Sequence, residues 1–237
     1  MPDRFEASAA EYYTGKLLQH GPTPAGVDWN SAESQDLRFE QLMKISSGAN
    51  DFSLLDFGCG YGALLTFLKS GGICRAFEEI AQNGPRPRRT LRAVGLSDGA
   101  ARGLCAYWGY DAAPAMLAKA RDLHQSDQGC HFVGRLEEVP PVDYSVASGV
   151  FNVKQGANAE EWRCYVLETL CRMAALSRRG FAFNLLTSYS EPDRMRESLY
   201  YADPCFFFDY CKTRISRHVA LLHDYGLYEF TMLVRME

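Results

Sequence analysis

One stretch, residues 53–62 (SLLDFGCGYG), constrains the fold of this chain more than any other. A short apolar run ends in Asp56, glycines then occupy every second position from 58 to 62, and a segment rich in apolar residues begins at Ala63. Glycine adopts backbone conformations that other residues avoid, and it lets a ligand approach the main chain closely. The pattern therefore predicts a strand, a turn that binds a nucleotide-like ligand, and a helix.

The spacing of these residues narrows the kind of ligand. Gly58, Gly60 and Ala63 satisfy the dinucleotide pattern G-x-G-x-x-A, which is weak by itself. Asp56 extends it to D-x-G-x-G-x-G, which resembles the first motif of class I S-adenosylmethionine-dependent methyltransferases. The resemblance implies that Asp56 holds the methionine end of the cofactor, directly or through water, and that the turn passes beneath its ribose and sulfonium. The alternative is a glycine-rich turn without a ligand. The cofactor contacts expected at the turn are Gly58, Cys59, Gly60 and Gly62.

A second nucleotide element follows at residues 105–111 (CAYWGYD), an apolar run that ends in Asp111. Pro114 then suits the first turn of a helix, in which Met116 and other apolar residues fall at helical spacing. The phrase Gly-Tyr-Asp-x-x-x-x-Met-Leu resembles the second methyltransferase motif. The resemblance implies that Asp111 binds both ribose hydroxyls and that Met116 contacts the adenine.

The distance between the two motifs is unusual, because Asp111 follows Gly58 by 53 positions. In a βαβ nucleotide unit the acidic residue comes roughly 20 positions after the glycines. An insertion is therefore expected at about residues 71–104, with the basic run PRPRR at 85–89. Helix-to-strand connections lie at the amino ends of strands, opposite the ligand site. A surface loop is the default interpretation, and a basic docking patch is the alternative.

The remaining segments predict an α/β fold: a Rossmann-like, seven-stranded, mostly parallel sheet with an antiparallel last strand and helices on both faces. Gly226 lies in a turn between the last two apolar strands, so these should form an antiparallel hairpin. A parallel sheet finished in this way is also what the resemblance implies. A dinucleotide dehydrogenase would need a second nucleotide-binding half, for which no residues remain. The further strands are expected at 130–134, 143–150, 181–186, 218–222 and 227–234.

The resemblance also implies a division of the chain. Residues 1–50 are expected to form a helical cap over the cofactor site, and residues 51–237 the methyltransferase domain with its insertion. Helices of such a cap cross the cofactor, so Arg38 is a candidate cofactor contact and Trp29 a candidate substrate contact. The alternative is that Trp29 anchors its loop and that Arg38 is a solvated helix charge.

Two later strand ends complete the expected site. After the third strand the family usually has an acidic residue that accepts a hydrogen bond from the adenine amine, whereas this chain has Arg135, which only donates. Leu136 is still expected to pack on the adenine. After the fourth strand, Ser148 is a candidate cofactor contact and Asn152 a candidate substrate contact, although asparagine there is often only a turn former. This segment lacks the acidic residue of metal-dependent relatives, so no metal is expected.

Composition and charge exclude other classes. The net charge of −4 and the absence of nucleic-acid motifs favour a small-molecule acceptor over nucleic acid. No apolar run approaches the roughly 20 residues of a membrane span. The first ten residues lack the apolar stretch of a secretory signal.

The eight cysteines form no C-x-x-C pair, which predicts buried free thiols in a reducing cytoplasm. The sequence does not indicate an oligomeric state.

These features lead to one functional hypothesis and one alternative. The hypothesis is an enzyme that transfers a methyl group from S-adenosylmethionine to an oxygen or nitrogen of a small molecule. The alternative is a non-catalytic S-adenosylmethionine-binding module, or a subunit that activates a partner through the basic insertion.

A base for the reaction is expected in the turn before the last strand. His223 lies there beside a carboxylate and a phenol, and histidine titrates near neutrality. His223 is therefore the candidate catalytic residue, on the acceptor side of the pocket. A turn whose polar residues face water is the alternative. Tyrosines expected to line that side are Tyr200, Tyr201 and Tyr225, with Tyr201 as a substrate contact.

Overall fold

The computed structural model describes residues 2–49, 51–71 and 103–236. The insertion expected at about residues 71–104, including its basic run at 85–89, therefore lies almost entirely outside the described residues.

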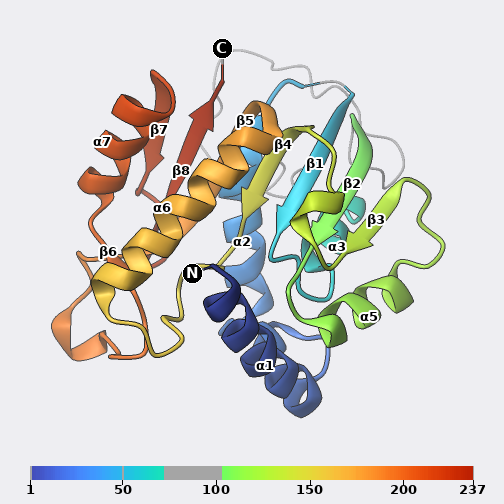
Figure 1. The fold of residues 1–237 in the computed structure, drawn as a ribbon, viewed down its shortest axis with the longest axis horizontal. Coiled ribbons are helices and arrows are strands. Elements are labelled where there is room, and N and C mark those ends of the chain that lie inside the picture. The colour runs from blue at the N-terminus through green and yellow to red at the C-terminus, as the bar shows by residue number, and fades with distance from the viewer. Residues whose placement is uncertain (1, 50, 72–102, 237) are drawn as a thin grey trace, which may run out of the picture.

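A single sheet with the strand order β3-β2-β1-β4-β5-β8-β7 forms the centre of the molecule (Figure 1). The strands β3, β2, β1, β4 and β5 run parallel, and β8 is antiparallel to both β5 and β7. The α/β fold class and the antiparallel last strand are thus confirmed. The strands are β1 (Phe52–Phe57), β2 (Leu104–Tyr110), β3 (Cys130–Val133), β4 (Val142–Ala147), β5 (Ser177–Thr187), β6 (Tyr201–Ala202), β7 (His218–Leu222) and β8 (Glu229–Arg235).

The structure adds one short strand to the seven expected from the sequence. β6 has two residues and pairs in parallel with the carboxyl end of β5, at Leu186 and Thr187. So short a segment carries no alternating apolar pattern that a sequence could reveal. Its position brings Tyr201, which is part of β6, and the preceding Tyr200 to β5 rather than to the ends of β1 and β2.

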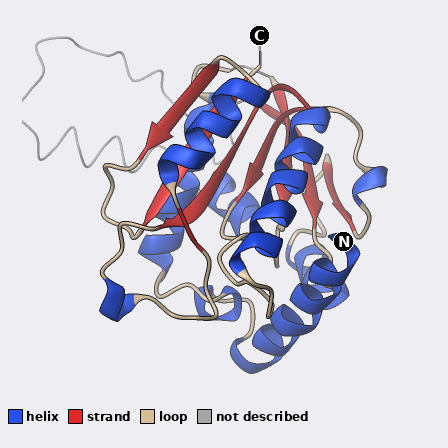
Figure 2. Cartoon of the chain, turned by 60° about the vertical axis from the view of Figure 1, so that its left-hand side comes forward, coloured by secondary structure: helices blue, strands red, loops and turns tan. Residues whose placement is uncertain are grey.

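Helices cover both faces of the sheet (Figure 2). Successive strand residues point to opposite faces, so Leu54 packs in a core with α2 and α3 while Leu55 packs in a core with α6 and α7. Asn158 and Glu161 form a capping box at the start of α6. The helices are α1 (Pro2–His20), α2 (Ala32–Met43), α3 (Ala63–Lys69), α5 (Pro114–Leu123), α6 (Ala159–Leu176) and α7 (Pro204–Arg214).

The first helix, α1, lies beyond the carboxyl ends of the parallel strands (Figure 1). Phe5 is buried against the aromatic rings of Trp162 and Tyr165 on α6. Further along α1, Ala10 and Tyr13 pack against Ala113 and Met116 at the start of α5. The helix therefore bridges the ends of β1, β2 and β4 from one side of the sheet to the other.

The cysteines depart from the prediction of buried thiols. Only Cys59 and Cys211 are buried among the described cysteines, whereas Cys105, Cys164, Cys171 and Cys205 are exposed. An apolar sequence context does not show which face of a helix or strand a residue occupies, and that face determines its burial. None of the helices in the described ranges is long and apolar enough to span a membrane. Within the same ranges, no cluster of three or more histidine, cysteine or acidic side chains could hold a metal ion.

Candidate functional site

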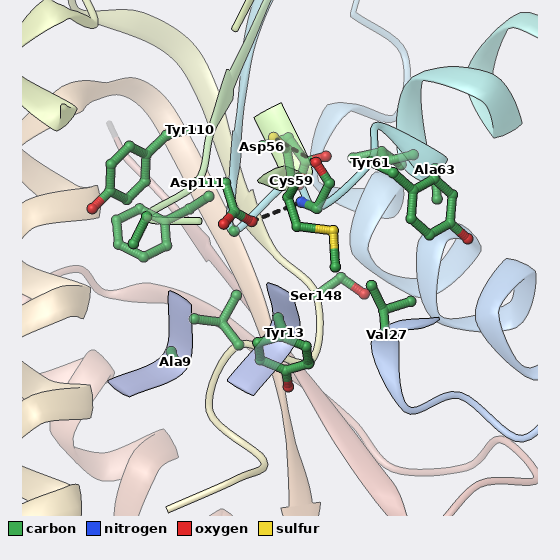
Figure 3. Close-up of a pocket in the computed structure, with 18 of the residues that line it drawn as sticks. Ala9, Tyr13, Val27, Asp56, Cys59, Tyr61, Ala63, Tyr110, Asp111 and Ser148 are labelled. Atoms are coloured by element: carbon green, nitrogen blue, oxygen red, sulfur yellow. Dashed lines mark hydrogen bonds between the residues drawn. The ribbon is translucent and has the colours of Figure 1, made fainter. Parts of the chain in front are cut away.

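A pocket lies at the carboxyl ends of β1, β2 and β4 (Figure 3). Its volume is about 950 Å³, which includes the part of its mouth that is open to solvent. The walls come from α1, from the segment around Trp29 and α2, from the glycine-rich turn after β1, from the residues after β2 and β4, and from α6. The lining residues include Glu6, Ala9, Tyr13, Val27, Trp29, Gln35, Phe39, Asp56, Gly58, Cys59, Gly60, Tyr61, Tyr110, Asp111, Met116, Ser148, Gly149, Val150, Gln155, Trp162 and Tyr165.

The glycine-rich turn is fixed to the neighbouring strand β2. The backbone N–H groups of Gly58 and Cys59 both donate to the carbonyl oxygen of Tyr110, at 2.8 and 2.9 Å. Gly58 has a φ of +76°, and a Cβ atom there would lie 2.5 Å from Cγ2 of Val150. Only glycine fits both the backbone conformation and the close approach of the segment after β4. Glycine at position 58 therefore allows the ends of β1, β2 and β4 to lie close together.

Asp111 directly follows β2, and backbone N–H groups fix its side chain against this turn. One carboxyl oxygen accepts a hydrogen bond from the N–H of Gly60 at 2.8 Å (Figure 3). The other accepts one from the N–H of Ala113, also at 2.8 Å. Burial raises the pKa of Asp111 above its ordinary value, although the two N–H groups oppose the rise. A carboxylate offers about four acceptor positions. Two hydrogen bonds to the backbone leave the others for hydroxyl groups of a ligand.

Asp56, at the end of β1, is the second carboxyl group of the pocket. Its side chain is buried, and the hydroxyl of Tyr107 on β2 donates to it at 2.6 Å. Burial raises the pKa of Asp56 to about 7, while the Tyr107 hydrogen bond acts in the opposite direction. A nearby positive charge would favour the ionised form. Asp56 is thus suited to a cationic ligand group.

Two smaller polar groups, the Ser148 hydroxyl and the Cys59 thiol, also line the pocket. The hydroxyl oxygen of Ser148, directly after β4, is buried without a hydrogen-bond partner among the described residues. A buried hydroxyl without a partner is costly, so this group is suited to a polar atom of a ligand. The thiol of Cys59 also lines the pocket, and burial raises its pKa well above the ordinary value.

The helix α1 supplies lining residues that the sequence did not identify. Glu6 accepts hydrogen bonds from the hydroxyl of Tyr110 at 3.0 Å and from the guanidinium of Arg172 at 2.8 Å. Tyr13 lies on the same helix, and burial raises the pKa of its hydroxyl. Glu6 and Tyr13 are seven positions apart, two turns of a helix, so they share one face. In the sequence, this seven-residue spacing and the alanines between the two residues were the only indication that Glu6 and Tyr13 share a helix face.

The structure brings eight of the predicted site residues to the pocket and leaves the others outside its lining. Those that line it are Trp29, Asp56, Gly58, Cys59, Gly60, Asp111, Met116 and Ser148. Those outside the lining are Arg38, Gly62, Leu136, Asn152, Tyr201 and His223. Gly62 lies just behind the turn, where a Cβ atom would be 2.8 Å from the ring of His124. Leu136 is buried in the core beside Val133 and Tyr110.

Arg38 has a role that neither sequence interpretation anticipated. It is not a solvated charge, because its side chain is only 8% exposed and forms an ion pair with the fully buried Glu229 of β8. Its guanidinium carbon lies 3.9 Å from the ring centroid of Trp29. Arg38 therefore contacts a lining residue and does not itself reach the pocket.

The residues expected on the acceptor side are displaced from it. His223 is exposed, and its ring lies near those of Tyr189 and Phe230, so the structure does not support the position predicted for it. The hydroxyl of Tyr201 accepts a hydrogen bond from the N–H of Arg196. The turn does lie at the expected edge of the sheet, but β4, β5 and β8 lie between β7, which His223 follows, and β1.

Asn152 and the remaining two tyrosines are also outside the lining. Asn152 is buried, and its backbone carbonyl oxygen accepts the N–H of Tyr200 at 2.9 Å, whereas its side-chain oxygen has no hydrogen-bond partner among the described residues. The hydroxyl of Tyr225 is within 2.8 Å of that of Thr231. Of these contacts, only that of Tyr225 with Thr231 on β8 is made by side chains.

Comparison with known proteins identifies the family. No family model matches the chain. A protein of Mycobacterium tuberculosis (strain ATCC 25618 / H37Rv) named "Putative methyltransferase Rv1506c" is 42% identical to it over 193 residues, which are 81% of this chain and 98% of that protein. This identity extends over nearly the whole relative.

Solved structures share the fold at low sequence identity. The N-methyltransferase NodS from Bradyrhizobium japonicum WM9, in complex with S-adenosyl-l-homocysteine, has a TM-score of 0.56 at 12% identity and covers 95% of this chain and 97% of its own. Magnesium protoporphyrin IX methyltransferase from Synechocystis PCC 6803, with bound SAH, has a TM-score of 0.52 at 13% identity and covers 99% and 97%. The relative and the solved structures agree: the chain belongs to the methyltransferase family of the mycobacterial protein and has the fold of the methyltransferases crystallised with S-adenosylhomocysteine.

Proposed function

We propose that this protein binds S-adenosylmethionine in the pocket at the ends of β1, β2 and β4 and methylates a small molecule there. The observation that carries the proposal is the Asp111 carboxyl group, which Gly60 and Ala113 hold at the pocket with acceptor positions left over. Asp111 would bind the ribose hydroxyls, Asp56 the methionine ammonium, and Met116 the adenine. Residues 1–50 would act as a cap, which the lining residues of α1 and α2 support.

The charge of the lining fits this ligand. Among the described lining residues, the charged side chains are Glu6, Asp56 and Asp111, and all are acidic. S-adenosylmethionine carries a positive sulfonium and a positive ammonium group. When bound, it supplies a methyl group that is already activated for transfer. The chain's own contribution is to bind, orient and desolvate the reactants, which lowers the barrier by fixing their geometry.

The same lining limits the acceptor. Arginine, lysine and histidine are missing from the described lining, so a carboxylate or phosphate on the acceptor would face only acidic groups. The walls are rich in aromatic side chains, among them Tyr13, Trp29, Phe39, Trp162 and Tyr165. We therefore infer a neutral or positively charged acceptor with an apolar or aromatic body. The Ser148 hydroxyl would receive a polar atom of one of the two reactants.

The test is isothermal titration with S-adenosylhomocysteine. The wild type should bind it, and Asp111→Ala should weaken binding by about a hundredfold or more. Asp122→Ala is the matched control, because Asp122 is exposed on α5 and pairs only with Lys119 in the part of the chain described. Equal affinities of wild type and Asp111→Ala would contradict the proposal. Transfer of radiolabelled methyl to compounds of a metabolite mixture would then identify the acceptor.

A further inference from the structure

A buried chain of hydrogen bonds runs from the last strand to the pocket wall. Its centre is Glu229, whose carboxylate accepts from Nε and Nη2 of Arg38 on α2, at 2.8 and 2.5 Å. The same carboxylate accepts from the side-chain amide of Asn184 on β5. Asn184 in turn accepts the backbone N–H of Gly149 at 2.8 Å. The orientation of the Asn184 amide is fixed, because a carboxylate only accepts and a backbone N–H only donates.

The two arms of this chain end at the same place in the pocket. One arm passes through Arg38, whose guanidinium stacks on the indole of Trp29. The other passes through Asn184 to Gly149, and a Cβ atom at Gly149 would lie 2.2 Å from the indole of Trp29. Trp29 is thus held between the guanidinium and the backbone after β4. Trp29 and Gly149 both line the pocket, as does Ser148, which directly precedes Gly149.

The energetics of the arrangement favour a role in positioning over one in stability. Removing two opposite charges from water costs free energy that their attraction repays only in part, so a buried ion pair adds little net stability. Every guanidinium nitrogen of Arg38 nevertheless has a partner, since Nη1 donates to the carbonyl oxygen of Ser34 at 2.6 Å. Glu229 is fully buried, so it has no contact with solvent. Such a network fixes side-chain directions closely.

We propose that Arg38, Asn184 and Glu229 are positioning residues, which set the indole of Trp29 and the Ser148–Gly149 backbone against the bound cofactor. The proposal rests on the proposed function, because it assigns the network to the cofactor pocket. None of the three side chains lines the pocket. They act through Trp29 and Gly149 alone.

The main test separates positioning from stability. In Glu229→Gln the buried guanidinium loses its counter-charge, so both the melting temperature and the affinity for S-adenosylhomocysteine should fall. In the double variant Arg38→Met/Glu229→Gln both charges are gone, and the melting temperature should recover towards that of the wild type. Affinity should stay about tenfold or more below wild type, because the indole has lost its stacking partner.

A second measurement does not depend on ligand binding. Asn184→Ala removes the acceptor of the Gly149 N–H, so hydrogen exchange at that amide should become faster. The control is Ser145→Ala/Ser177→Ala, which removes a buried 2.6 Å hydrogen bond between β4 and β5. These serines do not line the pocket. The control should change the melting temperature without changing the affinity or the exchange at Gly149.

The outcomes are distinguishable. If the wild type binds no S-adenosylhomocysteine, the proposed function fails, and the inference about the cofactor pocket fails with it. If the wild type binds it and the Arg38→Met/Glu229→Gln variant binds within about twofold of it, the proposed function stands and the positioning role is overturned. The role is also overturned if affinity follows the melting temperature across all variants, or if exchange at Gly149 in Asn184→Ala equals that of the wild type.

Discussion

Two buried carboxyl groups at the same edge of the sheet have opposite surroundings. Asp56 lies near the end of β1 and lines the pocket, and among the described residues its side chain accepts a hydrogen bond from Tyr107. Glu229 begins the antiparallel β8, which brings it to the same edge, and Arg38 and Asn184 occupy both of its oxygens. A buried carboxylate with a full set of partners organises its neighbours, whereas one beside a cavity with few partners has capacity left for a ligand.

Gly149 lies between the two regions, so its substitution should have the largest effect. Its φ is +70°, where a side chain costs about 1–2 kcal/mol, and a Cβ atom there would overlap the indole of Trp29. Gly149→Ala should weaken S-adenosylhomocysteine binding by about a hundredfold. Titration calorimetry measures this.

The matched control for that variant is Gly156→Ala. Gly156 has a similar φ of +77°, but a Cβ atom there would meet no heavy atom within 4 Å. It should show the backbone cost in its melting temperature and leave the affinity unchanged. Equal losses of affinity in the two variants would mean that backbone strain, and not the contact with Trp29, explains the effect.

Asp56→Asn should separate stability from binding. Burial raises the pKa of Asp56 to about 7, above its value in the unfolded chain, so folding takes up a proton. This contribution to stability is present at low pH and is lost as the pH rises through about 7. Asparagine has no such penalty, so at about pH 8 the variant should be more stable than the wild type by roughly 1 kcal/mol or more. Its affinity for S-adenosylhomocysteine should fall about tenfold.

Asp143→Asn should change the free energy of unfolding in the opposite direction to Asp56→Asn. Burial opposes ionisation of Asp143, but the hydrogen bonds from the backbone and side chain of Ser53 outweigh it and lower its pKa. Its stability contribution is present above the unfolded pKa and lost as the pH falls. Denaturant titrations at about pH 8 should therefore show a loss for Asp143→Asn and a gain for Asp56→Asn. If both variants gained stability, or both lost it, the two carboxyl groups would not differ in the way proposed.

Tyr107→Phe should have a smaller effect that acts through Asp56. The Tyr107 hydroxyl stabilises the ionised carboxyl group, so its removal should raise the pKa of Asp56 further. Affinity for S-adenosylhomocysteine, which should rise as Asp56 ionises, would then rise at a higher pH than in the wild type. Calorimetric titrations across the pH range locate this midpoint. Tyr144→Phe is a control on the neighbouring strand, and an unshifted midpoint in Tyr107→Phe would show that Asp56 does not control binding.

His223→Ala should have the smallest effect. The ring is exposed and outside the pocket lining, so affinity and methyl transfer should stay within about twofold of the wild type. Assays with the acceptor, once it is identified, would measure this at several pH values. A loss of affinity or activity of about tenfold or more would show that His223 takes part in binding or methyl transfer.

The parts that the sequence predicted are those encoded locally. An acidic residue at the end of an apolar strand, followed by glycines, places Asp56 and Asp111 at the edge of a parallel sheet without knowledge of any distant residue. The role of Arg38 could not be found in this way, because its partner Glu229 is 191 positions away. Nothing near Glu229 shows that it is buried. His223 was placed at the correct edge, but its distance from the pocket depends on how many strands lie between.

The position of β8 has a consequence for the order in which the molecule is completed during synthesis. It is the last strand in the sequence, yet it lies between β5 and β7. Until it emerges, β5 presents an unpaired edge, which is the kind of surface that promotes aggregation. Arg38, made much earlier, also has no counter-charge until Glu229 arrives. A nascent chain that stops before residue 229 would therefore expose an unpaired sheet edge and leave Arg38 without its counter-charge.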